Sequence, residues 1–245
     1  MKIRTSMALI LCLAAPLAWS AGTVKVYTPD STQPKTLTNA GHLLDLVGQP
    51  RLANSWWPGA VISEHQATVL AEQKQRALLA RLTGLAEQED GDDAAAINSV
   101  RQQLQALKIT GRQQINLDPD AVRVAENGNP TLEGEYTLWL PAQPSTITVM
   151  GLVSSPGKKP FTPGRDVAGY LDEQSALSGA DNSYAWVVYP DGRTQKVPVA
   201  YWNKRHIEPM PGSVIFVGFA DHFWTKAYDG LNADILHTLM QRIPD

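Results

Sequence analysis

The stretch from Ile147 to Gly218 constrains the fold most, because short strand-like segments and turn signals follow one another along it. Residues 147–153 alternate apolar side chains with polar or small ones, which is the period of a β-strand. Pro156-Gly157 and Pro163-Gly164 then mark turns. This part of the chain therefore predicts a small domain built on a β-sheet.

The rest of this stretch predicts the order of its elements. Residues 165–172 carry apolar side chains on one helical face, and the aromatic and β-branched segment 184–189 ends in Pro190-Asp191-Gly192, a strong hairpin signal. Pro211-Gly212 introduces a last strand at 213–219. Two strands, a helix, a hairpin and a final strand are the order of a β-grasp domain, so we expect an α+β fold.

The first 20 residues predict a cleavable signal peptide. Lys2 and Arg4 form a short positive region, residues 7–18 are mainly apolar, and Ala18-Trp19-Ser20 places small residues where a signal peptidase acts. An uncleaved anchor is disfavoured, because a membrane span needs about 20 apolar residues. We expect cleavage after Ser20 and a periplasmic mature chain.

Cysteine content and charge narrow the function classes. Cys12 is the only cysteine and lies within the predicted leader, so the mature chain would have no disulfide and no thiolate nucleophile. Loss of Lys2 and Arg4 leaves 19 basic against 24 acidic residues, a net charge of about −5. Because no basic tract stands out, nucleic acid is not expected as a partner. No later stretch is apolar enough to span a bilayer, and we expect a monomer.

Residues 21–143 predict a first copy of the same domain plan, before the clearer copy at 144–222. Expected strands lie at 23–28, 35–38, 57–62, 114–117 and 135–140, with a helix at 41–47. The order of these elements predicts two β-grasp domains in one chain.

An insertion with helical periodicity interrupts the first copy at residues 63–109. Its apolar stripes are Leu78, Leu82 and Leu85, then Ile97, Val100, Leu104 and Leu107. A break near Gly91 predicts an antiparallel helical hairpin. The acidic residues at its tip favour a solvated surface over a metal site.

The C-terminal segment 223–245 predicts one more amphipathic helix. Leu231, Ile235 and Leu239 recur at helical spacing with polar residues between them. Two interpretations remain open for this apolar face: it docks on the chain's own second domain, or it binds a partner or a membrane surface.

Trp56 and Trp57 are candidate ligand-binding residues. Adjacent residues on a strand face opposite sides, so one ring could be buried while the other offers an apolar plate to a ligand. Packing in the core is the alternative for each of them. The same two interpretations apply to Trp139, Trp186, Trp202 and Trp224.

Several longer phrases resemble the GfcC-type family of periplasmic capsule and exopolysaccharide biosynthesis proteins. They are Ser55-Trp56-Trp57-Pro58-Gly59-Ala60, Ile109-Thr110-Gly111-Arg112, Leu117-Asp118-Pro119-Asp120, Val122-Arg123-Val124 and Trp202-Asn203-Lys204-Arg205-His206. The resemblance extends over essentially the whole mature chain. It implies two β-grasp domains, a helical hairpin inserted in the first, and a C-terminal amphipathic helix.

The resemblance also implies a function and a site. It implies participation in making or exporting a surface polysaccharide, with the polysaccharide or the outer-membrane export components as partners. Its best site candidate is Arg112, whose guanidinium could grip a carboxylate or phosphate of a glycan. The alternative for Arg112 is an ion pair with Asp118 or Asp120, and Asp118 is a further candidate ligand residue.

Three hypotheses follow. The first is a non-enzymatic accessory protein that binds polysaccharide or the export machinery; the second is a protein-only adaptor that docks through its helices. A glycan-modifying enzyme is the third and least favoured, because the sequence has no nucleophile elbow or phosphate-binding glycine loop. The five histidines lack the helical spacing of zinc ligands, so neither a metal nor a cofactor is expected.

Overall fold

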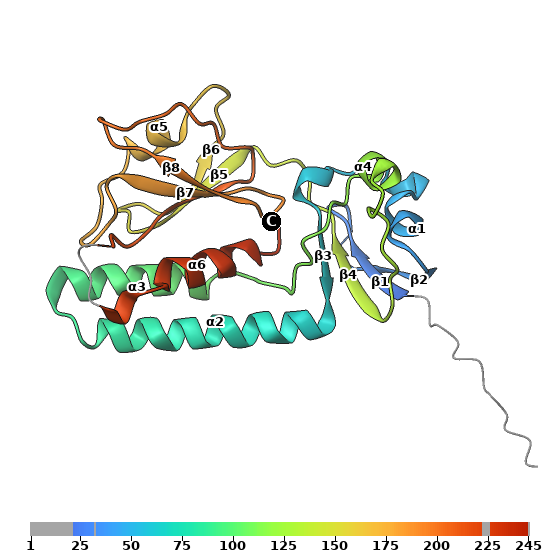
Figure 1. The fold of residues 1–245 in the computed structure, drawn as a ribbon, viewed down its shortest axis with the longest axis horizontal. Helices are drawn as coiled ribbons and strands as arrows, with labels where there is room; N and C mark the ends of the chain where they lie inside the picture. Colours follow the sequence, from blue (N-terminus) through green and yellow to red (C-terminus); the bar gives the residue numbers. More distant parts are fainter. Residues whose placement is uncertain (1–21, 32, 222–225, 245) are drawn as a thin grey trace, which may run out of the picture.

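The computed structural model describes residues 22–31, 33–221 and 226–244. The predicted signal peptide with its cleavage site after Ser20, the boundary between residues 222 and 223, and Trp224 lie outside these residues. Within them the protein is an α+β molecule with two mixed sheets and six α-helices (Figure 1).

The first sheet has the strand order β2-β1-β4-β3, with β1 and β4 parallel in the centre. Its strands are β1 (Gly22–Tyr27), β2 (Lys35–Ala40), β3 (Val61–Glu64) and β4 (Glu135–Trp139). The short helices α1 (Leu43–Val47) and α4 (Pro119–Val124) pack together, and Leu43 and Val122 from them join Val24, Ile62 and Leu138 in one core.

Two strands expected in this half were placed wrongly. Trp57–Gly59 is a 3₁₀ turn, η2, and the strand starts only at Val61, because Pro58 has no amide hydrogen to donate to a ladder. Residues 114–117 form no strand. Instead, one isolated bridge joins Arg112 to Ser63, and the amide of Gln113 donates to the carbonyl of Ile62 at 2.8 Å.

The second sheet has the strand order β6-β5-β9-β7-β8, with β5 and β9 parallel in the centre. Its strands are β5 (Thr146–Gly151), β6 (Gly157–Pro160), β7 (Tyr184–Val188), β8 (Thr194–Pro198) and β9 (Val214–Val217). Helix α5 (Val167–Leu171) lies on one side of this sheet, and three longer helices lie on the other (Figure 1).

These three helices are α2 (His65–Ala86), α3 (Gly91–Gln105) and the C-terminal α6 (Leu231–Met240). The expected hairpin and C-terminal helix are therefore present. The apolar stripe of the hairpin, including Leu82 and Ile97, is buried with residues of the second sheet rather than with the first core. Arg81 of α2 also pairs with Asp234 of α6 at 2.7 Å. The inserted hairpin thus completes the core of the second half of the chain.

Candidate functional site

An open cleft of about 600 Å³ lies at one end of the first sheet. Its walls come from the turn after β1, the segment around the 3₁₀ turn η1 (Pro50–Leu52), and the chain that leaves β4. The lining residues are Val26, Thr28, Pro29, Asp30, Ser31, Lys35, Arg51, Leu52, Asn54, Ser55, Trp56, Leu140, Pro141, Ala142 and Gln143. Its buried lining residues are apolar and its exposed ones are mainly polar, a combination that is typical of a ligand site.

Trp56 is the aromatic residue of this lining and is partly exposed. Its ring lies directly against the Cα of Gly59, where an added Cβ would come within 2.1 Å of Trp56 Cζ3 and 3.0 Å of Pro141 Cγ. Gly212, from the second half of the chain, also approaches the ring. The ring is therefore held in place by two glycines and a proline, and a flat apolar surface is pre-formed in the wall of the cleft.

Lys35 and Arg51 bring positive charge to the same cleft. Both residues are exposed, and within the described part of the chain their side chains form no hydrogen bond or ion pair. Asp30 is the acidic residue of the lining. Two uncompensated cations beside an aromatic ring can bind an anionic group and an apolar face at the same time.

Trp57 lies differently from its neighbour. It starts the turn η2 and packs, partly buried, against the first core. One of the adjacent tryptophans thus lines the cleft and the other packs on the core. They lie at the start of a 3₁₀ turn, and not on a strand as expected.

Arg112 lies outside this cleft and is buried, with 7 % of its surface exposed. Its Nη2 donates to the carbonyl of Pro190 at 2.8 Å, and Nη1 has no hydrogen-bond partner. Burial lowers the pKa of Arg112 to about 10, while the nearby Asp191 carboxylate raises it. The turn that carries Gly192 covers the guanidinium, so ligand binding by Arg112 stays a prediction that this conformation does not favour.

Asp118 is the N-cap of α4 and forms no ion pair with Arg112 among the described contacts. Its Oδ1 accepts from the amide of Asp120 at 2.9 Å, a local cap bond. Asp120 pairs with Arg123 at 3.0 Å. The ion pair considered as the alternative role of Arg112 is therefore not formed, and ligand binding by Asp118 stays a prediction.

Leu231, Ile235 and Leu239 lie on the buried face of α6, each with 1 % or less of its surface exposed. In this structure they pack in the chain's own core, as the docking interpretation expects. A partner could contact them only after α6 leaves this position, so their role in partner binding stays a prediction.

Sequence reasoning missed Lys35 and Arg51. Lys35 stands in a separate strand that only the fold brings beside Trp56, and Arg51, in the same segment as Trp56, had no pattern that marked it. The local signal was weak: a lone cation in a strand and another in a loop. Within the described residues, no three His, Cys, Asp or Glu side chains are arranged to hold a metal ion. The same part of the chain contains no helix that is both long and apolar enough to cross a membrane.

Comparison with known families gives two matches that together cover most of the chain. The family model described as "Capsule biosynthesis GfcC, N-terminal" matches residues 20–143, and the one described as "Capsule biosynthesis GfcC C-terminal" matches residues 155–244. The chain belongs to the GfcC family. A relative from Escherichia coli (strain K12), named "Uncharacterized protein YjbG", is 67 % identical over 241 residues, which are 98 % of this chain and 98 % of the relative. Family membership associates the chain with capsule biosynthesis.

Proposed function

We propose that this protein is a periplasmic, non-enzymatic accessory protein of capsule or exopolysaccharide biosynthesis or export, and that it binds glycan in the cleft beside Trp56. The observation that carries the proposal is the joint placement of Trp56, Lys35 and Arg51 around one open cleft, in a member of a capsule biosynthesis family. The ring can stack on the apolar face of a sugar, and the two cations can bind carboxylate or phosphate groups of the polymer.

The acidic content of the cleft supports binding rather than bond cleavage. Most glycoside hydrolases use a pair of carboxylates on either side of the scissile bond. Asp30 is the one carboxylate among the described residues of this lining. A single exposed acid beside two cations cannot supply both the general acid and the nucleophile or base.

The proposal includes two β-grasp domains, at 21–143 and 144–222, and a C-terminal helical segment at 223–245. The second sheet supports it, since its first and last strands are parallel neighbours in the centre and its helix α5 follows its second strand. The first sheet repeats this order without a full fourth strand. The bridge from Arg112 to Ser63 lies beside β3, where that strand would pair.

The proposed periplasmic location rests on the residues that precede the described structure. The charged start, the apolar core and the small residues before the cleavage position after Ser20 are the features of a secretory leader. A surface polysaccharide or the outer-membrane export components would be accessible to the mature chain in that compartment.

A protein-only adaptor is the second candidate, and the burial of Arg112 favours it. The arginine that the family resemblance points to binds Pro190 of the same chain, and it is not open to a glycan. In that case the export machinery, rather than the polymer, would contact the molecule.

Calorimetric titration of the mature chain with polysaccharide purified from the cell surface tests the proposal. We expect Trp56→Ala and the double variant Lys35→Gln, Arg51→Gln to weaken binding by about tenfold or more, since each removes a stacking surface or charge-assisted contacts. Lys25→Gln, which removes one positive charge from an exposed residue of β1 outside the cleft, is the control and should bind normally.

Absence of any binding by the unaltered protein, or equal weakening by Lys25→Gln, would contradict the cleft proposal. Binding of purified export components with no binding of polysaccharide would favour the adaptor. Shortened or chemically altered polymer after long incubation would instead indicate an enzyme.

A further inference from the structure

The turn after β8 presents two adjacent aromatic side chains to solvent. Tyr201 is 99 % exposed and Trp202 is 75 % exposed, whereas the preceding Ala200 is buried. Tyrosine and tryptophan normally cover much of their apolar area in a folded protein. Two uncovered rings side by side indicate a contact that the isolated chain does not satisfy.

The backbone of this turn is tightly fixed. The carbonyl of Ala200 accepts from the amides of Asn203 at 3.0 Å and Lys204 at 2.8 Å. The carbonyl of Ser183 accepts from Asn203 Nδ2 at 3.2 Å and from the amide of Val199 at 3.0 Å. The rings therefore project from a pre-ordered support, which lowers the entropy cost of binding.

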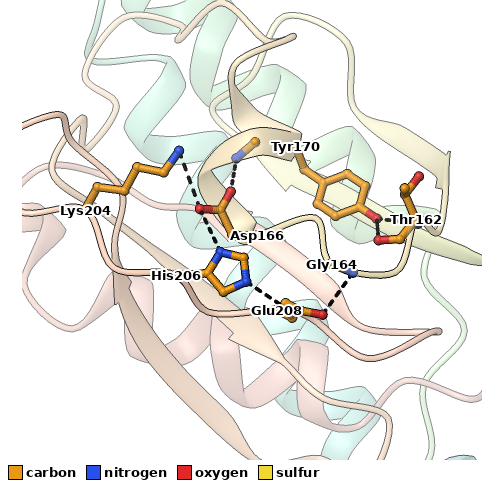
Figure 2. Close-up of polar contacts among 8 residues, drawn as sticks. Thr162, Gly164, Asp166, Tyr170, Lys204, His206 and Glu208 are labelled. Atoms are coloured by element: carbon orange, nitrogen blue, oxygen red, sulfur yellow. Dashed lines mark hydrogen bonds and ion pairs between the residues drawn. The ribbon is translucent and has the colours of Figure 1, made fainter.

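The segment after the turn is tied to α5 by a network of charged side chains (Figure 2). Lys204 Nζ lies 3.4 Å from Asp166 Oδ2, and His206 Nδ1 lies 3.8 Å from the same oxygen. His206 Nε2 also contacts Glu208 Oε1 at 2.9 Å. Asp166 in turn caps α5 by accepting from the amide of Gly169 at 2.7 Å. Lys204 and His206 are thus used to hold the segment in place.

Arg205 stands between these two anchored residues and is available for binding. Its side chain is exposed, and no described residue forms a hydrogen bond or ion pair with it. The turn therefore combines two free aromatic rings with one uncompensated guanidinium.

The small size of this surface indicates the kind of ligand. The other exposed large apolar residues of the described chain are Val69, Leu70, Ile115 and Val124 on other elements, and Tyr184 on β7, which pairs with β8. A stable protein interface buries about 800 Å² on each partner around an apolar centre, which two rings cannot supply. Because the described residues around the rings form no wide apolar surface, insertion into a bilayer is also disfavoured. A narrow polymer, which touches a few side chains at a time, fits better.

We propose that Tyr201, Trp202 and Arg205 form a second glycan contact, specific for an acidic chain that carries uronate residues. The rings stack on the apolar faces of consecutive sugars, and the planar guanidinium of Arg205 binds a sugar carboxylate through two parallel hydrogen bonds. This inference rests on the proposed function, and it adds the class of polymer and a place on the second half of the molecule.

The test uses the mature chain, with oligogalacturonate as the acidic probe and dextran of matched length as the neutral one. We expect Trp202→Ala and Arg205→Gln each to weaken oligogalacturonate binding by about tenfold, the loss of one stacking or charge-assisted contact. Arg76→Gln, an exposed arginine on α2, is the charge control and should bind as the unaltered chain does. Circular dichroism should be unchanged, because the altered side chains are exposed.

The outcomes separate this contact from the cleft. Weakening by Trp202→Ala and Arg205→Gln but not by Trp56→Ala would support the turn as a contact separate from the cleft. Loss in Trp56→Ala with full binding by both turn variants would overturn this inference and leave the cleft proposal intact. No binding of oligogalacturonate, equal binding of dextran, or Trp202-dependent binding only to vesicles of phosphatidylglycerol would also overturn it.

Discussion

Arg112, which the sequence predicts as a ligand contact, occupies a buried structural position in this fold. Its guanidinium is buried at the junction of the two halves of the chain, where it donates to Pro190 and lies against the Cα of Gly192. An added Cβ at Gly192 would come within 2.6 Å of Arg112 Nη1. A buried charge with one unpartnered nitrogen costs free energy, so its net contribution to stability is small even though its contacts are close.

We therefore expect Arg112→Met to be tolerated better than Arg112→Ala. Methionine fills much of the same volume and removes the cost of burying the charge, so the free energy of unfolding should change by about 1 kcal/mol or less. Alanine leaves a cavity and should cost about 2–4 kcal/mol. Urea unfolding measures both values. Equal losses in the two variants would show that the hydrogen bond to Pro190 dominates.

At the scale of elements, the link between α3 and the second sheet depends on Gly151 at the end of β5. Gln103 of α3 donates to the carbonyl of Gly151 at 3.0 Å and accepts from its amide at 2.8 Å. Gly151 has a φ of 97°, and an added Cβ would lie 2.0 Å from the carbonyl oxygen of Val217. Only glycine allows this backbone to meet both the neighbouring strand and the helix.

Gly151→Ala should therefore destabilise the protein by on the order of 3 kcal/mol or more, from backbone strain together with a clash in the sheet. Gly134→Ala is the matched control, since Gly134 has a φ of 99° with nothing within 4 Å of the added Cβ. That variant should cost about 1–2 kcal/mol. Thermal and urea unfolding provide the comparison, and similar losses at both positions would contradict the clash.

At the scale of the whole molecule, a hairpin inserted between β3 and β4 of the first sheet serves the core of the second. Leu82 of α2 is fully buried in the cluster that contains Ile147 and Ile215, whereas Leu43 of α1 is fully buried in the other cluster. The two halves of the chain are therefore coupled by side-chain packing as well as by the covalent chain. The position of the cleft depends on both halves.

This coupling predicts which strands and helices exchange their amide hydrogens faster when a buried side chain is truncated. Leu82→Ala should cost about 2–5 kcal/mol and raise amide hydrogen exchange in β5, β7, β9 and α6, although residue 82 lies in the insertion of the first half. Leu43→Ala is the matched control and should raise exchange in β1, β2 and β4. Exchange measured by mass spectrometry distinguishes the two patterns. Increased exchange confined to the first sheet in Leu82→Ala would contradict the coupling.

The sequence alone determined those features that repeat over a few residues. Alternation predicted the strand near 147–153, and aromatic and β-branched residues predicted the strand at 184–189. The spacing of Leu78, Leu82 and Leu85 predicted the hairpin, because the local period of burial is set by strand and helix geometry. The α+β class and the C-terminal helix followed from these patterns. The turn at Trp57–Gly59 was not predicted from the sequence, because Pro58 removes a hydrogen-bond donor and leaves the hydrophobic period unchanged.

Only the tertiary structure decided which surfaces meet. Periodicity identifies an apolar stripe but not its partner, so the packing of the hairpin on the second sheet could not be read from it. The cleft joins Lys35 of β2 to Arg51 and Trp56 of the segment that precedes β3, and a turn distant in sequence covers Arg112. Such contacts depend on long-range packing, in which the burial of one side chain is settled by residues that no local pattern contains.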